Sequence, residues 1–129
     1  MTVLIVDDSS VMFMVLDRAL RQSGLEISEV LGASNGLEGL RLLRSRTPEQ
    51  AAVRLILCDI NMPVMDGLEF LDQMRVEHLA EGAPVVMITT EGTAGHVRRA
   101  LAAGAAAYIH KPFSAEQVKS CLLSLLPTA

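Results

Sequence analysis

The sequence predicts an α/β protein with a doubly wound parallel sheet, formed by five successive β–α units. Three short apolar runs, at 3–6, 55–58 and 85–88, are continuous rather than alternating, as in strands that are covered on both faces. Segments with a helical spacing of apolar residues lie between these runs. Strands and helices that alternate in this way build a parallel sheet through right-handed crossovers.

Two weaker apolar runs complete the five expected strands. One spans 27–31 and is interrupted by Ser28 and Glu29, and the other spans 106–109. Because these runs are weaker, we expect them at the edges of the sheet, where one side of a strand meets water.

Helix starts are marked by residues whose side chains can accept a backbone N–H of the first helical turn. The first helix is expected to begin at Ser9 or Ser10 and to end before Gly24. The others are expected to begin near Asn35, near Asp66, in the segment before Val97 and at Ser114, the fourth ending near Gly104. The apolar faces expected to be buried are Met12, Val15, Leu16 and Ala19; Leu37, Leu40 and Leu43; Leu68, Leu71 and Met74; Val97, Ala100 and Leu101; and Val118, Cys121, Leu122 and Leu125.

Length and composition are those of one domain, with boundaries at 1–129. Half of the 129 residues are apolar and only 3% are aromatic, so aliphatic side chains and methionine must fill the core. The formal charge is −4 without a basic stripe, which argues against direct nucleic-acid binding. No apolar stretch approaches the roughly 18 residues of a membrane span, and the N-terminus lacks the features of a signal peptide. We therefore expect a soluble, cytoplasmic protein.

The two cysteines are expected to be reduced. Cys58 lies inside an apolar run and Cys121 on an expected helix. Neither has partner ligands at the short spacing of a metal or redox site. Both are therefore expected to pack as small apolar side chains.

Charged and hydroxyl residues stand where the expected strands end. Asp7 and Asp8 follow the first strand and Asp59 ends the third, while Thr89 ends the fourth and Lys111 ends the fifth. In open α/β sheets, ligands bind outside the carboxyl ends of the strands. If the first and third strands are neighbours, three carboxylates converge there, and such a cluster needs a cation or a proton.

Hard oxygen ligands of this kind suit Mg²⁺, which also accepts water and phosphate oxygens. A lysine and a threonine hydroxyl beside the metal could contact a phosphoryl group while a carboxylate oxygen attacks it. The residue types thus indicate a phosphoryl-transfer site.

Four motifs resemble the signatures of response-regulator receiver domains, and the resemblance covers essentially the whole chain. They are Val6–Ser9, Cys58–Pro63 with Met65–Gly67, Ile88–Thr89, and Tyr108–Phe113. The resemblance implies the flavodoxin-like, or CheY-like, (βα)5 fold with strand order 2-1-3-4-5. It also implies roles for single residues and a cofactor, Mg²⁺.

By this resemblance, Asp59 is the phosphoacceptor. Asp8, Asp59 and the backbone carbonyl of Asn61 would bind Mg²⁺ directly, and Asp7 would bind it through water. Lys111 and Thr89 would contact the phosphoryl group. The roles implied are thus catalytic for Asp59, Lys111, Thr89 and Asp7, and metal-binding for Asp7, Asp8, Asp59 and Asn61.

The resemblance further implies a switch. Inward movement of Thr89 would let Tyr108 swing inward and reshape the surface of the fourth helix, fifth strand and fifth helix. Asn61 and Glu91, two positions beyond Asp59 and Thr89, would influence the rate of dephosphorylation.

Three finer expectations accompany these roles. Thr89 rather than the adjacent Thr90 faces the site, because successive strand residues point to opposite faces. Gly67 supplies a backbone conformation that only glycine tolerates, or is an ordinary loop glycine. The family often has a cis bond before the proline at Lys111–Pro112, and the sequence leaves this open.

The function expected is that of a response regulator in bacterial two-component signal transduction. It would take a phosphoryl group from a sensor histidine kinase or phosphotransfer protein and catalyse its own phosphorylation and dephosphorylation, without being an enzyme for a separate substrate. With no output domain after the last helix, the output would be contact with a downstream protein, and the chain would be a monomer or weak dimer.

Alternatives within the family are a phosphorelay intermediate, a phosphate sink and a degenerate receiver that serves as a docking module. A remote alternative is an Asp-nucleophile phosphatase of the haloacid-dehalogenase kind. That class requires a second Asp two residues after the nucleophile, where this chain has Asn61, which cannot act as an acid.

Overall fold

Five parallel strands form a sheet in the order β2-β1-β3-β4-β5, as expected. The structure is a computed structural model that describes residues 1–46, 52–90 and 94–126. The strands are β1 Thr2–Val6, β2 Glu29–Ala33, β3 Val53–Asp59, β4 Val85–Thr89 and β5 Ala107–His110. The helices are α1 Ser10–Arg21, α2 Gly36–Ser45, α3 Gly67–Val76, α4 Ala94–Ala102 and α5 Ala115–Leu125.

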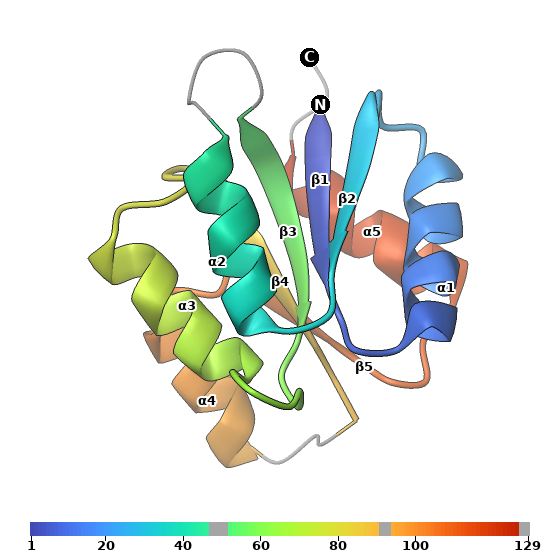
Figure 1. Ribbon diagram of the computed structural model, residues 1–129. Coiled ribbons are helices and arrows are strands. Elements are labelled where there is room, and N and C mark those ends of the chain that lie inside the picture. Colours follow the sequence, from blue (N-terminus) through green and yellow to red (C-terminus); the bar gives the residue numbers. More distant parts are fainter. Residues whose placement is uncertain (47–51, 91–93, 127–129) are drawn as a thin grey trace.

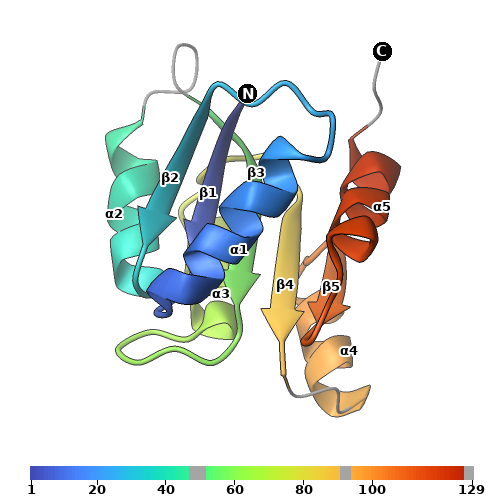
Figure 2. The same cartoon turned by 90° about the vertical axis from the view of Figure 1, so that its right-hand side faces the viewer.

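Helices cover both faces of the sheet (Figures 1 and 2). In β1, Leu4 and Val6 point into the cluster formed with α2, α3 and α4, whereas Val3 and Ile5 point into the cluster formed with α1 and α5. Both side-chain directions are therefore buried in apolar surroundings. This two-sided burial explains why the strand runs are continuous in the sequence, and β3 and β4 alternate in the same way.

The weaker strands lie at the two edges of the sheet, as expected, and both are partly exposed. The expected range of the second strand, 27–31, was two residues too early. Pairing with β1 fixes its start, because Thr2 stands opposite Glu29 and Val6 opposite Ala33. Ser28 precedes the strand, and its N–H donates to the Met1 carbonyl over 2.9 Å. The register with β1, and not the apolar pattern of the sequence, therefore determines where β2 begins.

The capping predictions are confirmed. Ser9, Asn35, Asp66 and Ser114 each accept the backbone N–H of the residue three positions later. Two predicted burial sites were wrong: Val15 on α1 and Leu101 on α4 are largely exposed. The helix faces that meet the sheet run through Leu16, Ala19 and Leu20 in α1 and through Ala100 in α4. The spacing of apolar residues along the sequence does not distinguish the side chains that face the sheet from those at the side of the helix.

The connection between α2 and β3 runs from the end of α2 at Ser45 to the start of β3 at Val53. Residues 47–51 of this connection lie outside the described residues. Among the helices of the described ranges, none combines the length and the apolar character that crossing a bilayer requires.

Gly67 is needed for space, which corrects the expectation of a special backbone conformation. It is the first residue of α3, and its N–H donates to the Ile60 carbonyl over 2.8 Å. A Cβ atom at this position would lie 2.3 Å from the Asp59 carbonyl oxygen and 2.9 Å from Ile60 Cα. The residue of this turn with a left-handed backbone is Val64, with φ of 70°.

We expect Gly67→Ala to lower the free energy of unfolding by about 1–3 kcal/mol or more, because the obstructing atoms are mainly backbone. Urea unfolding followed by far-UV circular dichroism measures this loss. Ser120→Ala, at an exposed position of α5, is the control and should change stability by less than about 0.5 kcal/mol. Equal stability of the two variants would show that α3 can move away from β3 without loss.

Candidate functional site

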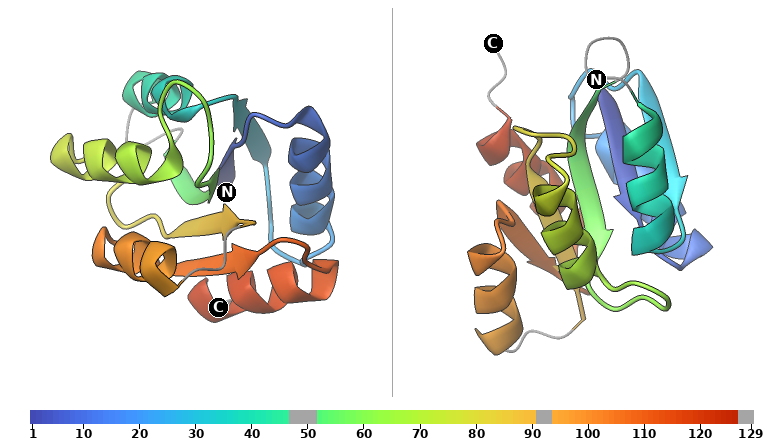
Figure 3. Two further views of the ribbon diagram at one scale, coloured as in Figure 1. Left: turned by 90° about the horizontal axis from the view of Figure 1, so that it is seen from below. Right: turned by 60° about the vertical axis from the view of Figure 1, so that its left-hand side comes forward.

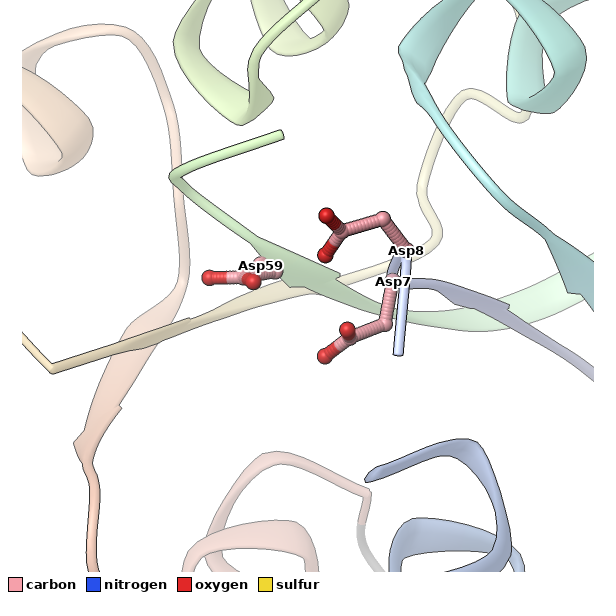
Figure 4. A group of neighbouring side chains, drawn as sticks. All are labelled: Asp7, Asp8 and Asp59. Atoms are coloured by element: carbon pink, nitrogen blue, oxygen red, sulfur yellow. The ribbon is translucent and has the colours of Figure 1, made fainter. Parts of the chain in front are cut away.

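Asp7, Asp8 and Asp59 converge at the carboxyl ends of β1 and β3 (Figure 4). The two strands pair in parallel with Val6 opposite Cys58, so the residues that follow them share one edge of the sheet. One carboxylate oxygen from each aspartate lies within 4.8 Å of the others. The convergence expected from the strand ends is therefore present in the structure.

Local hydrogen bonds hold the two buried aspartates. The Asp7 N–H donates to the Ala33 carbonyl over 2.9 Å and extends the ladder to β2. Asp7 Oδ1 accepts the Ser9 N–H over 2.9 Å, at the residue that caps α1. Asp59 Oδ1 accepts the Asn61 N–H over 3.3 Å. Asp8, by contrast, is exposed and can turn toward a ligand from the solvent side.

Lys111 reaches the cluster from the end of β5. Its Nζ lies 3.5 Å from Asp59 Oδ2 and 3.6 Å from Asp7 Oδ2. The backbone N–H of Lys111 donates to the Thr89 carbonyl over 2.7 Å, and the Lys111–Pro112 peptide bond is cis. Lys111 thus supplies one positive charge to three carboxylates, which leaves an excess of negative charge.

Burial raises the pKa of Asp59 above its ordinary value, and the neighbouring Asp7 carboxylate raises it further. The Lys111 ammonium and the Asn61 N–H oppose this rise in pKa without cancelling it. Ionised Asp59 is therefore under-compensated in the metal-free protein, and a cation beside it would favour the charged form.

The residues fit a divalent cation. Asp7 Oδ2 is buried and has no hydrogen-bond partner among the described residues, since Lys111 Nζ at 3.6 Å is too distant. An unpartnered buried carboxylate oxygen calls for a counterion. The three aspartate side chains offer carboxylate oxygens, which are the hard ligands that suit Mg²⁺. Asp7, Asp8 and Asp59, with the backbone carbonyl of Asn61, could hold this ion.

The two adjacent threonines differ in burial. Thr89 ends β4 with 1% of its surface exposed, whereas Thr90 is exposed. Tyr108 lies on the adjacent strand opposite Met87 and is 44% exposed, so its ring is not buried in the core. Glu91, the second residue expected to influence dephosphorylation, lies outside the described residues.

Cys58 is buried next to the phosphoacceptor candidate, and its Sγ donates to the Asp59 carbonyl over 3.2 Å. Burial raises the pKa of this thiol well above its ordinary value, so the thiolate does not form at neutral pH. Cys121 is also free and partly buried. Both cysteines pack in the apolar clusters, as expected.

Contacts that the sequence does not predict hold the segment after Asp59. Gly36, at the start of α2, donates its N–H to the Met65 carbonyl over 3.0 Å. The pair is separated by 29 positions, and only the folded chain brings it together. The sequence does show a glycine at the start of this apolar helix, but ordinary helix starts contain glycine as well, so it does not indicate the contact with Met65.

Asp59→Asn should raise the free energy of unfolding of the metal-free protein at pH 7. The pKa of Asp59 is raised by folding, so its ionised form opposes folding, and wild-type stability falls as pH rises from about 3.9 through that raised pKa. Asparagine lacks this charge. The difference between the variants should vanish below about pH 4.

Urea unfolding in the presence of a chelator, repeated across pH, measures this difference. Asp72→Asn on the exposed surface of α3 is the control and should follow wild type. A variant at Asp59 that is less stable than wild type at pH 7 would contradict the account of this charge.

Comparison with known proteins agrees with the geometry. Residues 3–122 match the response regulator receiver domain family. A chemotaxis protein CheY homolog of Campylobacter jejuni is 38% identical over 99% of this chain and 94% of its own length. The crystal structure of chemotaxis response regulator CheY4 of Vibrio cholerae superimposes with a TM-score of 0.80, at 31% identity over 97% of this chain and 98% of that one.

A third similar protein was crystallised with ligands. The CheY of a CheX–CheY–BeF3–Mg²⁺ complex from Borrelia burgdorferi has a TM-score of 0.81, at 30% identity over 96% of this chain and 87% of that one. The family match, the close relatives and the strand order agree with one another. This chain belongs to the response regulator receiver domain family.

Proposed function

We propose that this protein is a phosphorylation-controlled switch that accepts a phosphoryl group on Asp59 from a phosphohistidine of a sensor kinase or phosphotransfer protein. The observation that carries the proposal is the cluster of Asp7, Asp8 and Asp59 with Lys111 beside it. The cluster joins a nucleophile, ligands for a divalent cation and a cation of the protein itself.

The reaction assigns a task to each side chain. An Asp59 carboxylate oxygen attacks phosphorus as the P–N bond of the donor breaks, and the imidazole leaves. Lys111, already beside Asp59 Oδ2, contacts an oxygen of the transferred group and stabilises its charge. Asp7, Asp8 and Asp59 would hold Mg²⁺, which when bound would neutralise negative charge during the transfer.

Thr89 and Tyr108 are proposed to convert this chemistry into a change of surface. Thr89 ends the strand next to Asp59, and Ile88 stands opposite Asp59 in the sheet. In the pairing of β4 with β5, Thr89 stands opposite His110, which is two residues after Tyr108. A hydroxyl that moves toward the phosphoryl group would vacate space toward Tyr108. The surface that changes is α4-β5-α5, where a downstream protein would bind.

The same site would also release the phosphoryl group. Asn61 is exposed at the edge of the cluster, where its side chain can orient a water molecule toward phosphorus. Attack by that water would return free Asp59 and inorganic phosphate. The protein would then act on its own phosphoryl group, whether its output is a downstream partner, a relay or a phosphate sink.

Incubation with acetyl phosphate and Mg²⁺ should give a single phosphoryl adduct by intact-mass analysis. The adduct should be absent without Mg²⁺ and absent from Asp59→Asn, because both the ligand set and the nucleophile require that carboxylate. Asp72→Asn should label like wild type. No adduct in wild type under any condition would favour the docking-module alternative, and equal labelling of Asp59→Asn would refute the site.

Lys111→Ala should weaken switching more than Mg²⁺ binding. The ammonium lies 3.5 Å from Asp59 and repels a bound cation, so its removal should leave Mg²⁺ affinity unchanged or higher. Calorimetry measures Mg²⁺ affinity, and NMR shifts of α4-β5-α5 amides on addition of beryllofluoride measure switching. Lys119→Ala on α5 is the control. Equal loss of affinity and switching would contradict the role of Lys111.

A further inference from the structure

The segment that leaves the candidate metal site contains a strained turn. We define the β3–α3 loop as residues 60–66. Within it, the Met65 N–H donates to the Pro63 carbonyl over 2.8 Å around Val64, whose φ is 70°. A three-residue turn with a positive central φ is the rare, strained form of the γ-turn. A β-branched residue is especially unfavourable there.

Val64 does not offset this strain by its own packing, because 75% of its surface is exposed. Contacts elsewhere in the loop must therefore hold the turn. At the base of the loop, the Gly67 N–H donates to the Ile60 carbonyl over 2.8 Å. One residue before Asp66, the Gly36 N–H donates to the Met65 carbonyl over 3.0 Å. The second of these hydrogen bonds comes from a different helix, α2.

Gly36 is suited to this contact by its place in the chain. As the first residue of α2, it has an N–H that the helix itself does not use. A Cβ atom at Gly36 would lie 2.8 Å from Met65 Cγ and 2.9 Å from the Met65 carbonyl oxygen. Any side chain would therefore push against the atom that accepts the hydrogen bond. The loop passes beside the start of α2 in Figures 2 and 3.

The helix cannot easily move away from the loop. Farther along α2, the backbone of Gly39 packs so closely on the Phe70 ring that a Cβ atom there would lie 2.9 Å from Phe70 Cε1. Leu40 is fully buried in the same core. A displacement at Gly36 must therefore be absorbed mainly by the loop, which is already strained.

The other end of the loop is attached to the site. The Ile60 N–H donates to the Ile88 carbonyl of β4 over 3.2 Å, and the Asn61 N–H donates to Asp59 Oδ1 over 3.3 Å. Asn61 also offers the backbone carbonyl proposed as a metal ligand. Movement of the loop would therefore disturb both the Asp59 carboxylate and that carbonyl.

We propose that Gly36 is a positioning residue for the metal site: by holding Met65, it keeps the β3–α3 loop in the strained form that aligns Asn61 and Asp59 for a divalent cation. This inference rests on the metal site of the proposed function. It assigns an influence on Mg²⁺ affinity to Gly36, which lies outside the carboxylate cluster.

Gly36→Ala should weaken Mg²⁺ binding by about 10-fold, the lower end of the range for residues that support metal ligands. Calorimetric titration of the full chain with Mg²⁺ measures the affinity, and urea unfolding measures stability in parallel. Gly39→Ala is the matched control, since it also crowds a buried glycine of α2, but its nearest neighbours are Phe70 and Val6. It should lose stability and keep wild-type affinity. Equal affinity of Gly36→Ala and wild type would overturn the inference.

A measurement on the wild-type protein tests the same coupling without a variant. Because coupling between two events is reciprocal, Mg²⁺ should slow hydrogen exchange of the Gly36 amide, which bonds to Met65. The Gly39 amide bonds within α2 to Asn35 and should respond less. Unchanged Gly36 exchange at saturating Mg²⁺ would overturn this inference alone. Absence of Mg²⁺ binding by wild type would overturn the proposed metal site, and this inference with it.

Discussion

Parallel pairing of β1 with β3 is the constraint on which the site depends. It places the residues after two distant strands at one edge of the sheet, so Asp7 and Asp8 meet Asp59 although 52 and 51 positions separate them from it in sequence. Like charges would not gather there by themselves. The apolar strands enforce the convergence because their side chains are buried on both faces, and the energy of that burial offsets the repulsion at the edge.

The repulsion between the carboxylates at that edge favours the binding of a cation. Asp59 is buried enough to have a raised pKa, and Asp7 has an oxygen without a hydrogen-bond partner in the described structure. Lys111 compensates only part of this charge. A site in this condition gains more from a cation than a fully compensated site would, and the Lys111 ammonium beside Asp59 is already in place for the anionic group of the proposed reaction.

Most of the fold and the carboxylate cluster could be predicted from the sequence, because the evidence is local. Continuous apolar runs mark β1, β3 and β4, capping side chains mark four helix starts, and the acidic residues stand directly after strands. The start of β2, the exposure of Val15 and the reason for Gly67 depend on contacts between segments far apart in sequence. Register, helix orientation and close backbone approach arise only when those segments meet.

The two layers of helices attach to the site through different residues. The α2–α3 layer reaches it through Gly36, Gly67 and the β3–α3 loop, whereas the layer of α1 and α5 borders it through Ser9 and the segment after Lys111. Packing changes in the first layer therefore act on Asp59 and Asn61 through the loop, and changes in the second act on Asp7 through Ser9. The proposed metal site can therefore be tuned from either side of the sheet, by substitutions that leave all three carboxylates in place.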